Sequence, residues 1–363
     1  MSNFSNRFLA RTSLGMTSFW SYIRKKLVNE KDYYLGIESG SRTVVLLADP
    51  DGFTIGRGIG GASAYSLVGR EECNQILFQA ILAAFASAGF KTRDILASEG
   101  TLPLVKTVCI GMRGVERPKD EATVRRILTE FNLGDNAQIK VTSEARVVLE
   151  AGIPDGIGVA VLAGEVGLTF GQGPGSKTAQ AAGNGYLLGD EGSSHYLGLQ
   201  VVKAVLRAAD GRGSATALTE LVAREWKIDP NRPDLVEKHA YDLLNGLGTG
   251  GNKATLITTV ATFKQTLALL APGLERLAAK GDEVAGQILD GCAEEVAQAV
   301  QAVIKKSGLD TLPAPTPLVL SGSILLSSAG ELKQRLLARL PDVAEPVLVL
   351  EAAEGALKLA LAQ

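Results

Sequence analysis

Apolar and polar positions follow a repeated order from residue 32 onward. Short apolar runs come first, and the second and third are joined by the turn residues Asp-Pro-Asp-Gly at 49–52, which favour a hairpin. Longer stretches with apolar residues at helical spacing follow, with further strands between them. The pattern predicts strands at 33–38, 43–48, 53–58, 105–111 and 138–142, and helices at 68–89, 119–132 and 144–151.

The second half of the chain repeats this order with longer helices. It predicts strands at 157–164, 168–173, 177–182, 318–322 and 346–350, and helices at 193–209, 215–226, 253–279, 282–306, 329–339 and 354–362. Three strands followed by alternating helices and strands, seen twice, predict an α/β protein with two lobes flanking a cleft. We expect an N-terminal lobe at 32–153 and a C-terminal lobe at 154–363 with helical insertions. A return of the last helix to the first lobe is left open. Ligands are expected at the strand ends that face the cleft.

Composition narrows the choice of ligand. The 363 residues are 46% hydrophobic and 5% aromatic, enough for more than one core. The net charge of -2 and pI of about 5.9 provide no basic field for nucleic acid, so a small ligand is favoured.

The three cysteines, Cys73, Cys109 and Cys292, are far apart and form no CxxC. This argues against a disulfide framework, a zinc site or an iron–sulfur cluster, and predicts small core residues in a reducing compartment. No apolar run approaches the length of a membrane span, so we expect a cytoplasmic protein.

Residues 1–31 form a separate basic leader. This segment has one acidic residue, Glu30, and six basic residues: Arg7, Arg11, Arg24, Lys25, Lys26 and Lys31. Four apolar residues recur at helical spacing: Trp20, Ile23, Leu27 and Val28. This pattern is typical of an amphipathic helix that binds a membrane surface or a protein partner, with a start like that of a transit peptide. The alternative is a helix packed on its own domain, or a partly disordered terminus.

Four stretches then point to one family. GYLLGDEGSSHYLG (185–198), AADGRGSATAL (208–218), VCIGMRGVERPKD (108–120) and the pair LSG (320–322) with EGALKLA (354–360) resemble motifs of the N-acetylglucosamine kinase and BadF/BadG/BcrA/BcrD-type ATPase family. This family lies in the actin, hexokinase and heat-shock ATPase superfamily. The resemblance covers residues 34–363.

The resemblance implies two ribonuclease-H-like lobes that close about a hinge. It also implies transfer of the γ-phosphoryl group of ATP to a sugar hydroxyl or to water, with Mg²⁺ bridging phosphate oxygens. N-acetylglucosamine is the amino sugar it suggests. A homodimer is left open, and no protein metal ligands are predicted.

The first phosphate turn of the family, DGGGTKT, corresponds to Glu38, Ser39, Gly40, Ser41, Arg42, Thr43 and Val44. One of the three glycines remains, and we expect the serines to restrict backbone approach to a phosphate. Arg42 offers a fork of donors, so anion binding is weakened and not excluded.

The second turn, GTGS in the family, reads Gly164, Glu165, Val166 and Gly167. A carboxylate there repels a phosphate by about 1 to 4 kcal/mol per charge pair. We hypothesise that Arg42 and Glu165 approach one another and fill the nucleotide space; the alternative is that Arg42 points to solvent. Gly322 and Gly355 match the adenosine-side glycines of the family.

The catalytic base of the family corresponds to Glu144, in Thr142-Ser143-Glu144-Ala145, where the family has aspartate. Glutamate reaches one methylene further, and a misplacement of about 1 Å costs on the order of 10²-fold in rate. The alternative is that Glu144 only opens the next helix. Glu38 is the second candidate catalytic carboxylate. The asparagine that contacts the N-acetyl group in the family is replaced by Ala64.

The sugar side is the best preserved. The resemblance assigns sugar contacts to Asp190, Glu191 and Ser193, with the preceding turn shaped by Gly183, Asn184 and Gly185. The alternative for DEGSS is a helix start whose acids and serines cap N–H groups. His195 and His239 have no evident partner, so we expect surface or core roles for both.

Two functions therefore stay open at this level. One is an ATP-dependent amino-sugar kinase whose phosphoryl transfer is weak or lost. The other is a catalytically inactive relative that binds a sugar or a protein. An ATPase activator of a dehydratase is rejected, because such members bridge a cluster with cysteines that are absent here.

Overall fold

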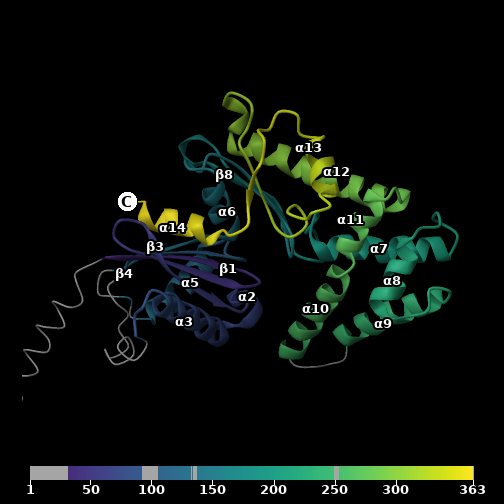
Figure 1. Ribbon diagram of the computed structural model, residues 1–363, viewed down its shortest axis with the longest axis horizontal. Coiled ribbons are helices and arrows are strands. Elements are labelled where there is room, and N and C mark those ends of the chain that lie inside the picture. The colour runs from purple at the N-terminus through teal and green to yellow at the C-terminus, as the bar shows by residue number, and fades with distance from the viewer. Residues whose placement is uncertain (1–31, 92–104, 132, 134–136, 249–252, 363) are drawn as a thin grey trace, which may run out of the picture. The chain divides into compact units, whose positions relative to one another are not determined.

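The computed structural model describes residues 32–91, 105–131, 133, 137–248 and 253–362 (Figure 1). Their contacts divide the chain into two compact units. Unit 1 comprises Met1–Thr142 with Ala356–Gln363, and unit 2 comprises Ser143–Gly355. The predicted boundaries at 31/32 and 153/154 remain predictions, and the leader 1–31 lies outside the described residues.

Unit 1 is built on a five-stranded sheet of order β3-β2-β1-β4-β5. Strand β1 pairs antiparallel with β2 and parallel with β4, and β2 pairs antiparallel with β3, which confirms the predicted meander. The strands are β1 (Tyr33–Ser39), β2 (Thr43–Ala48), β3 (Thr54–Gly60), β4 (Val105–Met112) and β5 (Gln138–Ser143), and the helices are α2 (Tyr65–Val68), α3 (Arg70–Ser87) and α5 (Pro118–Thr129).

Alternate glycines in β3 explain how α3 packs on this sheet. A Cβ at Gly58 would lie 1.9 Å from the carbonyl oxygen of Ala80, and one at Gly56 would lie 2.2 Å from that of Ala84. The helix backbone therefore rests directly on the strand. Behind this contact, side chains of β1, β2, β4, α3 and α5 form one apolar core.

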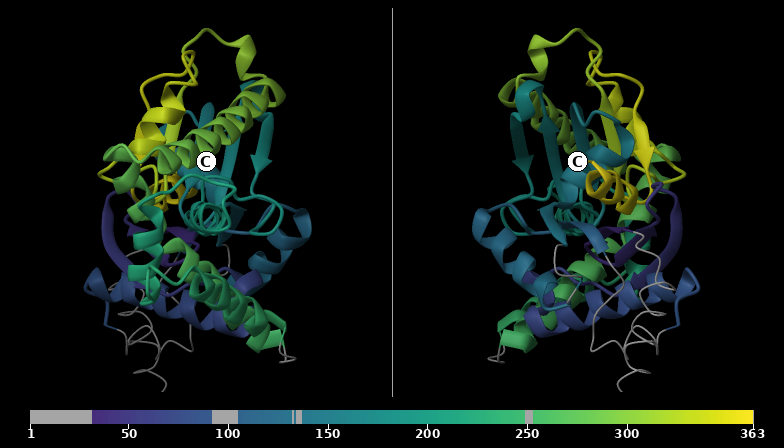
Figure 2. Two further views of the ribbon diagram at one scale, coloured as in Figure 1. Left: turned by 90° about the vertical axis from the view of Figure 1, so that its right-hand side faces the viewer. Right: turned by 90° about the vertical axis from the view of Figure 1, so that its left-hand side faces the viewer.

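Unit 2 repeats the strand order, since its sheet reads β8-β7-β6-β9-β10 from one edge to the other. The long helix α12 packs on β6, β7 and β8 (Figure 2). The strands are β6 (Gly158–Ala163), β7 (Gly167–Gln172), β8 (Thr178–Ala182), β9 (Leu318–Ser321) and β10 (Val347–Val349). The helices are α6 (Glu144–Gly152), α7 (Ser194–Ala209), α8 (Leu218–Trp226), α9 (Pro233–Gly248), α10 (Lys253–Ala268), α11 (Ala271–Ala279), α12 (Glu283–Ser307), α13 (Glu331–Leu337) and α14 (Ala353–Leu361), which continues into unit 1.

Two mixed five-stranded sheets covered by helices confirm the predicted α/β class with two lobes. One helix prediction was wrong, one helix starts later than predicted, and one helix was missed. The stretch 253–279 is two helices, because Pro272 lacks an N–H group and fits only the first turn of α11. Gly69, with φ +87°, separates α2 from α3 within 68–89. Helix α9 was not predicted.

The predicted core role of Cys73, Cys109 and Cys292 agrees with their burial. None of the helices in the described part of the chain combines the length and apolar character that a membrane span needs.

Candidate functional site

Three segments of unit 2 meet at the carboxyl end of its central strand β6. They are the β6–β7 turn (Gly164–Gly167), the segment 183–193 before α7, and the residues that follow β9. The N–H of Ser194 donates to the Gly164 carbonyl at 2.6 Å, and that of Ile324 donates to the Ala163 carbonyl at 3.0 Å. We call this arrangement the unit 2 site.

Glycines allow these backbones to pack so closely. A Cβ at Gly167 would lie 1.9 Å from the carbonyl oxygen of Glu191, and one at Gly322, with φ +99°, would lie 2.3 Å from that of Ala163. Gly164 is buried as well, next to Ser323. The predicted phosphate-turn glycines and Gly322 are therefore needed to build the site, whatever ligand it binds.

Asp190 is a buried polar residue of this site with an unusual backbone conformation. It is 3% exposed and adopts φ +62°, a left-handed conformation that costs a non-glycine residue on the order of 1 kcal/mol. Its carboxylate accepts backbone hydrogen bonds from Gly167 and Gly185. Burial raises the pKa of this carboxyl above its usual value, while nearby Lys264 opposes the rise. The fold thus holds one carboxylate rigidly beside the turn.

Ser193 and His195 form the start of α7. Ser193 caps the helix by accepting the N–H of Tyr196 at 3.2 Å, and its hydroxyl lies 3.0 Å from Nδ1 of His195. His195 is 4% exposed, and burial lowers the pKa of its imidazole to about 4, so the ring is neutral at pH 7. The capping interpretation of DEGSS therefore applies to Ser193, whereas Asp190 bonds to the backbone of Gly167 and Gly185.

The turn before Asp190 is shaped by glycines with positive φ. Gly183 and Gly185 have φ values of +71° and +87°, and the N–H of Gly189 donates to the Gly185 carbonyl at 2.9 Å. Asn184 is exposed. These glycines allow the chain to turn before Asp190. The sugar contacts of this segment remain predictions.

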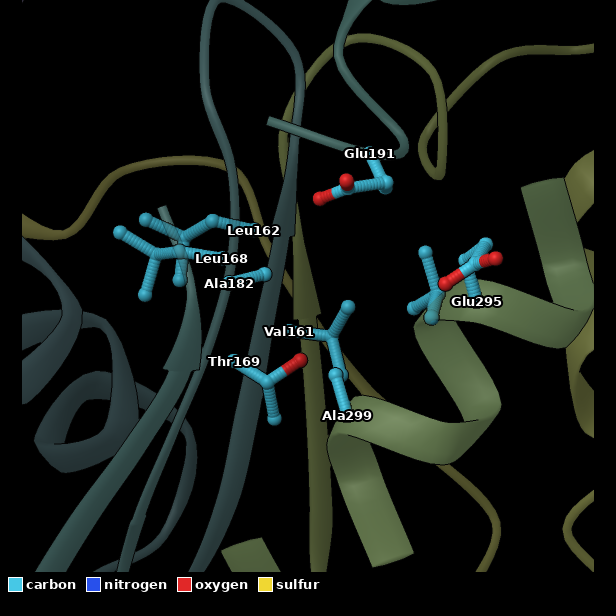
Figure 3. Close-up of a pocket in the computed structure, with 9 residues that line it drawn as sticks. Val161, Leu162, Leu168, Thr169, Ala182, Glu191, Glu295 and Ala299 are labelled. Carbon is cyan, nitrogen blue, oxygen red and sulfur yellow. The ribbon is translucent and has the colours of Figure 1, made fainter. Parts of the chain in front are cut away.

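Glu191 lies at one end of a small pocket between the sheet and α12 (Figure 3). The pocket has a volume of about 10 Å³, and Glu295 of α12, Val161 and Thr169 also line it. This space suffices for one water molecule at most. A sugar would therefore have to bind outside it. The lining residues are Val161, Leu162, Leu168, Thr169, Ala182, Glu191, Glu295, Val296 and Ala299.

The matching turn of unit 1 is held by a chain of buried hydroxyls. Thr43 Oγ1 donates to the Gly61 carbonyl at 2.7 Å, and lies 2.5 Å from Ser63 Oγ, which lies 2.8 Å from Ser39 Oγ. Each hydroxyl has one proton, so Ser63 donates to Thr43 and Ser39 donates to Ser63. All three side chains are fully buried. Ser39 therefore faces the interior of unit 1 and does not crowd the exposed side of the turn.

The exposed side of this turn consists of Ser41 and Arg42, while Glu38 is half-buried and Gly40 is buried. The Gly40 N–H donates to the Arg42 carbonyl at 3.0 Å, which closes the turn. Arg42 and Glu165 belong to different units, and both side chains are exposed. Their predicted approach remains a prediction.

Glu116 is a candidate that sequence reasoning missed. The Arg113 N–H donates to the Ser39 carbonyl at 2.8 Å, so the loop after β4 lies beside the unit 1 turn. Glu116 follows in this loop and is exposed. The available signal was a carboxylate just after the strand that runs parallel to β1, at the sheet edge where α/β proteins bind ligands.

Glu144 occupies a different setting from Glu116. It is the first residue of α6 in unit 2 and is 9% exposed, and the preceding Ser143 caps the helix by accepting the Arg146 N–H at 3.2 Å. An acidic residue at this position interacts favourably with the positive end of the helix dipole. Its two predicted roles, base and helix start, both remain predictions.

Gly355 has a packing role within unit 2. A Cβ there would lie 1.9 Å from the Val147 carbonyl, so its absence lets the start of α14 rest on α6. Its predicted cofactor contact remains a prediction. Across the described residues, no group of three or more His, Cys, Asp or Glu side chains is placed to hold a metal ion.

Comparisons with known proteins agree with the motifs. Residues 35–360 match the model of the BadF/BadG/BcrA/BcrD ATPase family. The chain is 28% identical over 294 residues to the N-acetyl-D-glucosamine kinase of Dictyostelium discoideum, covering 80% of this chain and 85% of that one. It is 26% identical over 274 residues to the N-acetylmuramic acid/N-acetylglucosamine kinase of Clostridium acetobutylicum, covering 75% and 79%.

Two solved structures share the fold. A candidate N-acetylglucosamine kinase from Chromobacterium violaceum gives a TM-score of 0.61 at 23% identity, over 91% of this chain and 99% of that one. Another from Porphyromonas gingivalis gives 0.58 at 17% identity, over 90% and 97%. This likeness confirms the predicted sugar-kinase fold. Because the family model spans nearly all of residues 32–363, the protein belongs to the BadF/BadG/BcrA/BcrD ATPase family.

Proposed function

We propose that this protein binds an N-acetylated amino sugar at the unit 2 site and phosphorylates it slowly with ATP. The observation that carries the proposal is Asp190, a buried carboxylate held by two backbone N–H groups in a strained conformation. Strain of this kind persists where the surrounding structure and a function both require it. The kinases named above, which act on N-acetylglucosamine, support the choice of sugar.

Asp190 and Glu191 would supply the recognition. Ionised carboxylates accept hydrogen bonds only, so they suit sugar hydroxyls, which donate. Asp190 is already fixed by Gly167 and Gly185, and its orientation costs no further entropy when the sugar binds. The sugar would thus be oriented before transfer.

A base must then accept the proton of the attacking hydroxyl. Glu144 and Glu38 are the candidates from sequence, and exposed Glu116 at the carboxyl edge of the unit 1 sheet is a third. Glu116→Gln should abolish turnover if that residue is the base, and Glu144→Gln should do so if Glu144 is. Mg²⁺ would be held mainly by the phosphates of ATP and would neutralise their charge, since no cluster of ligands exists in the described residues.

The low rate follows from Glu165. Its side chain is exposed on the β6–β7 turn, where the resemblance expects phosphate, and a negative charge there opposes a triphosphate. Glu165→Gln removes the charge and keeps the size. We expect this variant to bind Mg-ATP about tenfold more tightly and to turn over faster.

Isothermal titration with Mg-ATP, with and without N-acetylglucosamine, and a coupled ADP assay test the proposal. Binding of both ligands and a slow sugar-dependent release of ADP are expected. Glu237→Gln in α9, which removes an exposed carboxylate outside the site, serves as the control for Glu165→Gln. Wild-type protein that binds no amino sugar would contradict the proposal.

The second candidate is a sugar-binding relative without catalysis. The carboxylate of Glu165 in the turn and the exposed Arg42 favour it, because both depart from the family pattern. Sugar binding without any nucleotide binding, in wild type and in Glu165→Gln alike, would establish this candidate. A protein or membrane partner for residues 1–31, a homodimer and a cytoplasmic location remain predictions.

A further inference from the structure

His195 has no role in the reaction proposed above. Its imidazole is 5% exposed and sits on the first turn of α7. One ring nitrogen, Nδ1, lies 3.0 Å from the Ser193 hydroxyl. The other, Nε2, is buried without a hydrogen-bond partner among the described residues. A buried polar atom without a partner is costly, so native proteins keep few of them.

The hydrogen bonds around Ser193 bear on which ring nitrogen carries the proton. Ser193 Oγ accepts the N–H of Tyr196, so its own proton is available for Nδ1. If Nδ1 accepts that proton, the neutral ring carries its hydrogen on Nε2. The Glu165 carbonyl raises the pKa of the imidazole, in opposition to burial. In this tautomer the Tyr196 N–H donates to Ser193 Oγ, and the Ser193 hydroxyl donates to Nδ1. The donor that then has no acceptor is Nε2–H.

That last donor faces Asp190. Nε2 lies 3.8 Å from Oδ2 of Asp190, about an ångström beyond a normal hydrogen bond. Both side chains are nearly inaccessible to water, so a hydrogen bond between them would not compete with solvent. A small rotation of either side chain would close the gap.

We propose that His195 is a positioning residue, whose Nε2–H steadies the Asp190 carboxylate in the orientation that a sugar hydroxyl meets. Gly167 and Gly185 hold this carboxylate from the backbone, and His195 adds a side-chain donor. Lys264, which lies 5.9 Å above the ring of Tyr186, contributes charge to both groups without replacing the donor. This inference rests on the proposed function.

Sugar binding measured without ATP tests the role. His195→Phe keeps a ring and removes both nitrogens, and we expect sugar affinity to fall about tenfold, the loss of one hydrogen bond to a charged group. His195→Gln places an N–H near the position of Nε2 and should restore most of the affinity. Affinity for Mg-ATP should not change in either variant, and where turnover is measurable, only KM for the sugar should rise.

Nitrogen NMR of the imidazoles tests the same contact without relying on variants of His195. The chain has two histidines, so His239→Gln assigns both signals. We expect His195 as the Nε2–H tautomer, with its Nε2 resonance displaced by added sugar and by Asp190→Asn, while His239 stays unchanged.

The outcomes separate the two proposals. Wild-type protein that binds no sugar would overturn the proposed function, and this inference with it. Sugar that binds His195→Phe as tightly as wild type, or a His195 resonance that ignores both sugar and Asp190→Asn, would overturn the inference alone.

Discussion

The two hairpin turns of this protein occupy equivalent places and are built in different ways. Each joins a central strand to its antiparallel neighbour, in sheets of the same strand order. The β1–β2 turn is held from behind by the hydroxyls of Ser39, Thr43 and Ser63. The β6–β7 turn is held by backbone packed on backbone, at Gly164 and Gly167.

This difference changes what the loss of glycines in the first turn means. A side chain at Ser39 is tolerated because it points into the unit and bonds there, whereas no side chain would fit at Gly167. The number of glycines in a turn therefore does not measure its capacity to bind an anion. We expect the charges on the exposed side, Arg42 in one turn and Glu165 in the other, to matter more.

The largest expected effect comes from adding a side chain to the second turn. Gly167→Ala would place a Cβ 1.9 Å from the Glu191 carbonyl, forcing the backbone apart at a cost of about 3 kcal/mol. The urea midpoint of unfolding should fall accordingly, and sugar affinity should fall with it. Gly291→Ala in α12, where a Cβ meets nothing within 4 Å, is the matched control. Equal midpoints for the two variants would show that the turn does not depend on close packing.

The second largest expected effect is a pH dependence of stability. It distinguishes the two turns, because the β6–β7 turn lies beside the buried His195. The pKa of His195 is about 4 in the fold and 6.5 when unfolded, so the unfolded chain binds the proton first as pH falls. The contribution of neutral His195 to the free energy of unfolding is complete above pH 6.5 and is lost as the pH falls toward 4. At pH 5 this loss is about 2 kcal/mol.

Urea titrations at pH 8 and pH 5 measure this effect. His195→Gln should show a smaller loss of stability between the two pH values than wild type, and His239→Gln should behave like wild type. The expectation fails if His195→Gln retains the full acid-side loss.

The smallest effect concerns the hydroxyl chain of the first turn. Ser63→Ala leaves the buried Ser39 hydroxyl without its acceptor, while Thr43 keeps its bond to the Gly61 carbonyl. The free energy of unfolding should fall by about 1.5 kcal/mol. Ser41→Ala, at an exposed position of the same turn, should change it by less than about 0.5 kcal/mol. If Ser63→Ala were as stable as Ser41→Ala, the hydroxyl chain would not be what stabilises this turn.

Sequence reasoning predicted the strand pattern and the family. The β1–β2–β3 meander was readable because apolar runs and the Asp-Pro-Asp-Gly turn are local signals. The break in 253–279 was missed because the helical pattern continues on both sides of it, and α9 because its charged residues weaken the apolar pattern.

The details of the site could not be predicted in the same way. His195 was assigned a structural role because its partners are not spaced as a motif, and only the fold places Nε2 near Asp190. Glu116 was passed over because its position beside the first turn depends on the parallel pairing of β4 with β1.

The sequence by itself determined most of the strands and helices and the family to which the chain belongs, because hydrophobic period, turn residues and short motifs act over a few residues. Only the tertiary structure decided which way Ser39 faces, why Gly167 and Gly322 must lack side chains, and that Asp190 and His195 meet in a buried site. These outcomes depend on segments brought together from distant parts of the chain, where burial and close packing set the cost of every atom.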